Sequence, residues 1–155
     1  MIRVVWGTGR ARTEKGSFDR ALAEAGIHQY NLRELSSVVP AGADIDVAGT
    51  APNLGPTGNA LDAVIARQTS PPGTRASAGL AWARGDDGTG IFYEVGDHDP
   101  ESVAELLRSG IETGCEIRTI EDAAVETKVT TAGAEPDRYA TAVVVATYGE
   151  SEPLL

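Results

Sequence analysis

The chain has 155 residues, of which 41% are hydrophobic and 23% are charged. This length and composition are typical of a globular domain that buries its own core, so we expect a single domain over residues 1–155. The net charge of −10 argues against nucleic acid as a partner, because phosphate groups repel such a surface. No apolar run approaches the ~20 residues that span a membrane, and the first residues lack the regions of a signal peptide.

A single cysteine, Cys115, cannot form an internal disulfide, and no cluster of cysteine and histidine indicates a metal site. We therefore expect a cytoplasmic protein that binds no metal, nucleic acid or membrane. The 23 acidic residues could attract cationic ligands, but a solvated coat of carboxylates is their more ordinary role. Lys15 and Lys128 are the only lysines, and alanine and glycine are abundant, a composition that suggests adaptation to high salt.

In the first part of the chain, the pattern predicts a strand followed by a helix. The apolar run of residues 2–6 predicts a strand that ends in a turn at Gly7-Thr8-Gly9. Ser17 is the expected N-cap of a helix that runs to Ala25 and ends before Gly26.

Alternating or continuous apolar runs predict six further strands. They cover residues 29–35, 60–68, 75–84, 89–95, 123–129 and 139–148. Residues 40–58 are expected to form a long irregular connection, because glycine and proline are frequent there, and residues 149–155 a loose tail. A second helix should begin at the cap Asp99-Pro100-Glu101 and run to about Thr113. Strands in succession with two helices favour an α+β fold with a mostly antiparallel sheet over a doubly wound fold.

Several common site types find little support in the sequence. Gly7-Thr8-Gly9 follows a strand, but the third glycine of a dinucleotide site is missing and no Walker lysine follows, so a tight turn is the better interpretation. His28 and His98 are isolated and do not stand at the spacing of metal ligands. Cys115 is more typical of a small buried hydrophobe than of a nucleophile.

Ser36 and Ser37 follow an extended segment, where a serine pair alone indicates only a turn. Their setting is more specific, because a series of short motifs occurs around them in a fixed order. These motifs are Ser17-Phe18-Asp19-Arg20-Ala21-Leu22, Ala25-Gly26-Ile27, Asn31-Leu32, Leu35-Ser36-Ser37-Val38-Val39-Pro40 and Gly90-Ile91-Phe92-Tyr93-Glu94. The ordered set resembles the pyruvoyl-dependent arginine decarboxylases, closely over residues 1–40 and more loosely over residues 75–148.

The resemblance implies a proenzyme that cuts itself between Ser36 and Ser37 into a β chain, residues 1–36, and an α chain, residues 37–155. Ser37 would become a covalently bound pyruvoyl group, and neither a metal nor pyridoxal phosphate would be needed. L-arginine would form a Schiff base with this group, which accepts electrons as CO2 leaves, and agmatine would result. The resemblance also implies a four-layer αββα sandwich and a homotrimer of αβ units with sites between neighbouring protomers.

The resemblance also assigns roles to individual residues. Asn31 matches a residue associated with processing and catalysis, where an amide can donate to an oxyanion. Glu94 matches the proposed proton donor, and burial beside Phe92 would raise its pKa. Asp19 matches the acid that binds the guanidinium group, and Ser36 joins it in the substrate-binding set. Apart from the resemblance, Asn31 and Glu94 would be ordinary polar residues of strands, and Asp19 would be an acid in the first turn of a helix.

Three alternatives remain open at this point. The chain could be a pyruvoyl decarboxylase for another amino acid, since His28 and Tyr30 replace smaller residues near the substrate strand. It could be a homologous subunit without catalytic activity. It could also be a small nucleotide-binding protein that uses Gly7-Thr8-Gly9.

Overall fold

The computed structural model describes all 155 residues and contains two helices and nine strands. The helices are α1 (Glu14–Ala25) and α2 (Pro100–Arg118). The strands are β1 (Ile2–Ala11), β2 (Asn31–Glu34), β3 (Val38–Val39), β4 (Ile45–Gly49), β5 (Ala60–Ser70), β6 (Ala76–Arg84), β7 (Gly90–Asp97), β8 (Glu126–Ala132) and β9 (Tyr139–Tyr148).

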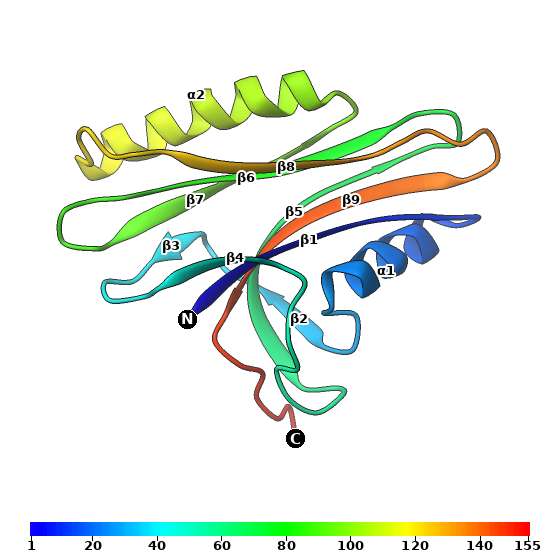
Figure 1. Ribbon diagram of the computed structural model, residues 1–155, viewed down its shortest axis with the longest axis horizontal. Helices are drawn as coiled ribbons and strands as arrows, with labels where there is room; N and C mark the ends of the chain where they lie inside the picture. Colours follow the sequence, from blue (N-terminus) through cyan, green and yellow to red (C-terminus); the bar gives the residue numbers. More distant parts are fainter.

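The strands form two sheets, one with the order β2-β5-β9-β1-β4 and one with the order β3-β7-β6-β8. Only the pairs β1–β4 and β2–β5 are parallel, so the predicted α+β fold with mostly antiparallel sheets is confirmed. Helix α1 packs on the five-stranded sheet and α2 on the four-stranded sheet, and the two sheets face each other (Figure 1). This order of helix, sheet, sheet and helix agrees with the sandwich that the resemblance implies.

Three hydrophobic clusters fill the spaces between these layers. The largest lies between the two sheets, and the other two lie under α1 and under α2. Strand β9 contributes to two clusters at once, because Val144 and Ala146 face the other sheet while Val143 and Val145 face α1. The prediction of a buried central strand at residues 139–148 is therefore confirmed.

The predicted turn at Gly7-Thr8-Gly9 is wrong, because β1 continues to Ala11. Both glycines lie where α1 crosses the strand closely. A Cβ atom at Gly7 would lie 2.1 Å from the carbonyl oxygen of Ala21, and one at Gly9 would lie 2.4 Å from the carbonyl oxygen of Ser17. These glycines therefore permit close helix packing, and the segment offers no nucleotide-binding loop.

Ser17 does not cap α1, contrary to the prediction. Thr13 is the N-cap, and its side chain accepts a hydrogen bond from the backbone of Gly16. Ser17 is buried inside the helix, where its hydroxyl contacts the hydroxyl of Thr141 at 2.7 Å. The predicted end of the helix at Gly26 is confirmed, since this glycine has a φ of 82°.

Asp99 caps α2 as predicted, but the helix continues past the predicted end at about Thr113 to Arg118, with Thr119 as its C-cap. Gly110 and Gly114 are buried helix positions. A Cβ atom at Gly110 would lie 2.0 Å from the ring of Tyr93, so these glycines make room for side chains of β7 and do not end the helix.

The connection at residues 40–58 and the tail at residues 149–155 are more ordered than predicted. Strand β4 lies within the connection and pairs parallel with β1. In the tail, Glu152 forms a bridge with Ala60 and an ion pair with Arg33. Both segments depend on partners distant in the chain, and no periodic local pattern marks them.

Replacing Gly7 by alanine is expected to lower the free energy of unfolding by about 1–3 kcal/mol, because the added methyl group must push α1 away from β1. Chemical denaturation of the purified protein measures this change. Gly85→Ala is the control, because a Cβ atom there would meet nothing closer than 3.6 Å. Equal stabilities of the two variants would contradict the close-packing role of Gly7.

Candidate active site

Ser37 lies in the segment that carries the chain from one sheet to the other. Leu35 still belongs to the first sheet, since its backbone N–H donates to the carbonyl of Ala63 at 2.9 Å. Three residues later, at Val38, β3 begins in the second sheet and pairs with β7. Between them Ser37 has a φ of 71°, in the left-handed region that residues other than glycine rarely adopt. The sequence-predicted cleavage site is therefore a locally strained point of the backbone.

The hydroxyl of Ser37 faces a carboxylate on the neighbouring strand. Its Oγ donates to Glu94, with both Oε1 and Oε2 at 2.9 Å. The carbonyl oxygen of Ser37 accepts a hydrogen bond of 2.8 Å from the backbone N–H of Phe92. Strand β7 thus holds both the side chain and the carbonyl of Ser37, and the structure brings together two of the predicted catalytic residues.

The pKa of Glu94 is raised above its ordinary value, mainly because burial disfavours the charged carboxylate. The hydrogen bond from Ser37 acts in the opposite direction, and the nearby negative charge of Glu34 raises the pKa further. A carboxyl group with a raised pKa can hold a proton closer to neutral pH than a fully solvated glutamate can.

Tyr148, at the end of β9, is a polar residue of this region that the sequence did not indicate. Its hydroxyl donates to the carbonyl oxygen of Val38 at 2.7 Å, and its ring packs edge-on against Phe92. Burial and the neighbouring Glu94 raise the pKa of Tyr148 to about 12, so the hydroxyl remains a donor at neutral pH. No local pattern could have revealed it, because Tyr148 reads only as the last residue of an apolar strand.

A cavity of about 740 Å³ opens beside Ser37 and Glu94. Its walls come from the Ser36–Ser37 segment, from β7 and from one face of α2. The part of this wall that α2 contributes includes the small residues Ser109, Gly110, Thr113 and Gly114. Glu94 and Arg118 are the only charged residues in the lining. The serine–carboxylate pair therefore adjoins a space large enough for a small molecule.

The structure does not bring Asn31 or Asp19 to Ser37 within one chain. Asn31 is the first residue of β2, and its side-chain N–H donates to the carbonyl of Gly58 at 2.8 Å. Asp19 is exposed on α1, which covers the face of the five-stranded sheet that points away from Ser37 (Figure 1). Ser36, in contrast, lines the cavity.

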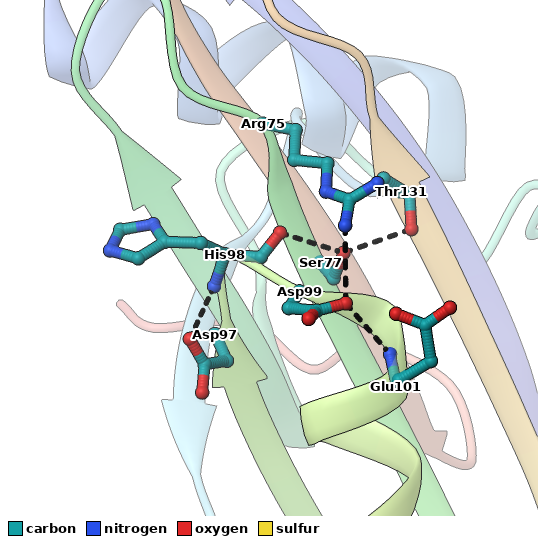
Figure 2. Close-up of polar contacts among 7 residues, drawn as sticks. All are labelled: Arg75, Ser77, Asp97, His98, Asp99, Glu101 and Thr131. Atoms are coloured by element: carbon teal, nitrogen blue, oxygen red, sulfur yellow. Dashed lines mark hydrogen bonds and ion pairs between the residues drawn. The ribbon is translucent and has the colours of Figure 1, made fainter.

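A second polar cluster lies where β7 leads into α2 (Figure 2). Asp99 accepts a hydrogen bond from the backbone N–H of Glu101 and pairs with Arg75 at 3.1 Å. Ser77 links the carbonyl of His98 to the hydroxyl of Thr131. These contacts join the start of α2 to β6 and β8, so the cluster is an anchor of the helix.

Other features of the chain complete the description of possible sites. Histidine, cysteine and carboxylate side chains nowhere gather in groups of three that could hold a metal ion. No helix has both the length and the apolar composition needed to cross a membrane. Cys115 is partly buried and borders the cluster under α2.

An α+β domain with a serine–carboxylate pair beside a cavity fits an enzyme, and comparisons with known proteins identify which kind. Residues 1–153 match the family model of pyruvoyl-dependent arginine decarboxylase. A pyruvoyl-dependent arginine decarboxylase of Halobacterium salinarum (strain R1) is 46% identical over 155 residues, which cover 99% of this chain and 96% of the relative. Those of Methanopyrus kandleri and Pyrococcus horikoshii are 34% and 33% identical, covering 92% and 68% of this chain and 91% and 68% of the relatives.

The chain therefore belongs to the pyruvoyl-dependent arginine decarboxylase family. The family and the class of enzyme predicted from Ser36-Ser37 and its neighbouring motifs are confirmed.

The raised pKa of Glu94 predicts a pH-dependent stability, which can be measured in a Ser37→Ala background that lacks the serine hydroxyl. A raised pKa means that folding favours the protonated form. This stabilisation is complete below the ordinary pKa of 4.5 and is lost as the pH rises through the folded pKa. Adding Glu94→Gln is therefore expected to raise the thermal midpoint at about pH 8, with a smaller difference at about pH 4. An unchanged midpoint at both pH values would contradict the shift.

Proposed function

We propose that this protein is a proenzyme that cleaves itself between Ser36 and Ser37, and that its mature form converts L-arginine to agmatine and CO2. The products of cleavage are a β chain, residues 1–36, and an α chain, residues 37–155, that begins with a pyruvoyl group. The observation that carries the proposal is the pair of 2.9 Å contacts from Ser37 Oγ to Glu94, at a strained residue beside the cavity.

Cleavage begins when Ser37 Oγ attacks the carbonyl carbon of Ser36, and Glu94 is placed to accept the hydroxyl proton. The C–N bond between the two serines breaks, the nitrogen takes up a proton, and an ester joins the residues. Loss of the Cα proton of Ser37 then expels the carboxylate of Ser36 and leaves dehydroalanine. Its imine tautomer adds water and releases ammonia. One water is consumed overall, and the strain at Ser37 favours the first step.

The residues around Ser37 fit the pyruvoyl group that would form there. The carbonyl of Ser37 already accepts a hydrogen bond from the N–H of Phe92, and the Ser37 side chain already contacts the carboxyl group of Glu94. When present, a pyruvoyl group supplies a ketone that binds the substrate amine covalently and accepts electrons as CO2 leaves. The N–H of Phe92 holds the amide oxygen of residue 37 and stabilises negative charge on it. Glu94, with its raised pKa, can deliver a proton to the product carbon.

The arginine assignment rests on Asp19, whose carboxylate can accept two hydrogen bonds from a guanidinium group. Because α1 and Ser37 lie on opposite sides of the five-stranded sheet, Asp19 of one chain cannot serve Ser37 of the same chain. We therefore propose a homotrimer in which each site combines Ser37 and Glu94 of one protomer with Asp19 of a neighbour. Asn31, which is exposed and bonds to Gly58 instead of Ser37, would act across the same boundary.

The single cysteine, which has no disulfide partner within the chain, is compatible with a cytoplasmic location, and this compartment is part of the proposal. The pyruvoyl group would be the only cofactor, without a metal or pyridoxal phosphate.

Ser37→Ala is expected to abolish both cleavage and decarboxylation, because no hydroxyl remains to attack the Ser36 carbonyl. Intact mass of the purified protein reports cleavage directly. Ser36→Ala is the matched control and should still cleave, since Ser36 contributes its carbonyl and not its hydroxyl to the reaction. Intact wild-type chains together with full absence of activity would instead indicate a non-catalytic subunit.

Asp19→Asn is expected to weaken transition-state binding of arginine by about 2–5 kcal/mol, because a charged partner of the guanidinium is lost. Co-expression of Asp19→Asn with Ser37→Ala in equal amounts should give mixed trimers with about a quarter of the wild-type activity. In a random cyclic trimer, about one site in four combines the intact Ser37 of one chain with the intact Asp19 of its neighbour. Steady-state kinetics of the mixed protein measures both effects.

The control for this mixture is Ser37→Ala co-expressed with Glu94→Gln. Ser37 and Glu94 contact each other within one chain, so every site in this mixture lacks one of the two residues and no activity should be recovered. Normal arginine turnover by Asp19→Asn alone would contradict the guanidinium role.

A decarboxylase for another amino acid is the second candidate function. It is favoured by one observation, which is that the cavity lining of a single chain offers no carboxylate besides Glu94 for a guanidinium group. Rates with arginine, lysine, histidine and aspartate separate the two candidates.

A further inference from the structure

Cleavage leaves residue 37 at the start of a new chain, held by few contacts. Strand β3 has only two residues, Val38 and Val39, and lies at the edge of the four-stranded sheet. Val38 is 52% exposed, so the apolar contact of this strand comes from Val39, which is buried between the sheets two residues after position 37. Chain ends with so few contacts tend to fray, whereas the reaction requires residue 37 to stay against Phe92 and Glu94.

Tyr148 supplies a contact on the free side of this edge strand. The carbonyl of Ser37 points to β7 and accepts from Phe92, while the next carbonyl, that of Val38, accepts the hydroxyl of Tyr148 at 2.7 Å. Successive carbonyls of a strand point in opposite directions, so the tyrosine occupies the place of a missing neighbouring strand.

Tyr148 is itself firmly placed. Its backbone pairs with Ile2 at the end of β9, in the other sheet, and its ring packs against Phe92. The hydroxyl therefore links the five-stranded sheet to the second peptide bond of the future α chain, between Val38 and Val39. Since the pKa of Tyr148 is raised to about 12, this donor is retained over the range in which Glu94 titrates.

We propose that Tyr148 is a positioning residue that holds the Val38 carbonyl and so keeps residue 37 aligned with Phe92 and Glu94, both during cleavage and in the mature enzyme. The inference rests on the proposed function, because it assumes that residue 37 becomes the reactive end of the α chain. It assigns Tyr148 no contact with the substrate and no proton transfer.

Tyr148→Phe tests the proposal, with Tyr139→Phe as the matched control. Tyr139 begins the same strand, and its hydroxyl makes no hydrogen bond within the chain. Losing the Tyr148 hydroxyl is expected to slow cleavage, which intact mass follows. It should also lower kcat of the cleaved enzyme roughly twofold to thirteenfold, the factor that corresponds to one hydrogen bond. KM for arginine and the shape of the pH–rate profile should stay as in wild type.

Three outcomes would overturn the proposal. Cleavage and kcat equal to wild type would show that the hydroxyl is dispensable. Equal losses in Tyr139→Phe would indicate a general effect on β9. A shifted alkaline limb of the pH profile would make Tyr148 a proton donor instead. Thermal midpoints in the Ser37→Ala background show whether each variant folds. Wild-type protein is followed in the same cleavage assay: if it is not cleaved, the proposed function fails, whereas normal cleavage of both wild type and Tyr148→Phe contradicts only this inference.

Discussion

The bond from Ser37 Oγ to the carboxylate of Glu94 is the interaction on which the site depends. It joins the crossing segment between the sheets to the middle of β7, at 2.9 Å to each carboxylate oxygen. It also opposes the rise in pKa that burial imposes on Glu94. Removing the hydroxyl therefore changes both the geometry and the charge of the site, because one contact controls both.

The strained backbone conformation of Ser37 persists because hydrogen bonds fix the chain both before and after this residue. Leu35 is bonded to β5 before it, and the carbonyl of Ser37 is bonded to β7 after it. The chain must pass from one sheet to the other within this short interval, and a left-handed residue accomplishes the change of direction. The architecture of two facing sheets thus places a strained serine beside a carboxylate and a cavity.

Both helices approach their sheets through glycine. Gly7 and Gly9 on β1 admit the backbone of α1, and Gly110 and Gly114 on α2 admit Tyr93 and Ile91 of β7. On the α2 side this small-residue face also borders the cavity. Glycine therefore allows close packing of both outer layers, and in the layer of α2 this contact lies at the wall of the cavity.

Much of this protein follows from the sequence by itself. Apolar runs located the long strands, since burial of one face imposes a pattern on adjacent residues, and the cap Asp99-Pro100-Glu101 located the second helix. The ordered motifs around Ser36-Ser37 identified the family, and Asp99 and Gly26 marked helix ends through local capping chemistry. Only the tertiary structure revealed β3, β4, the ordered tail, the helix-packing role of Gly7 and the contact of Tyr148 with Val38. These features depend on partners far apart in the chain, and such contacts leave no periodic signal in the residues that make them.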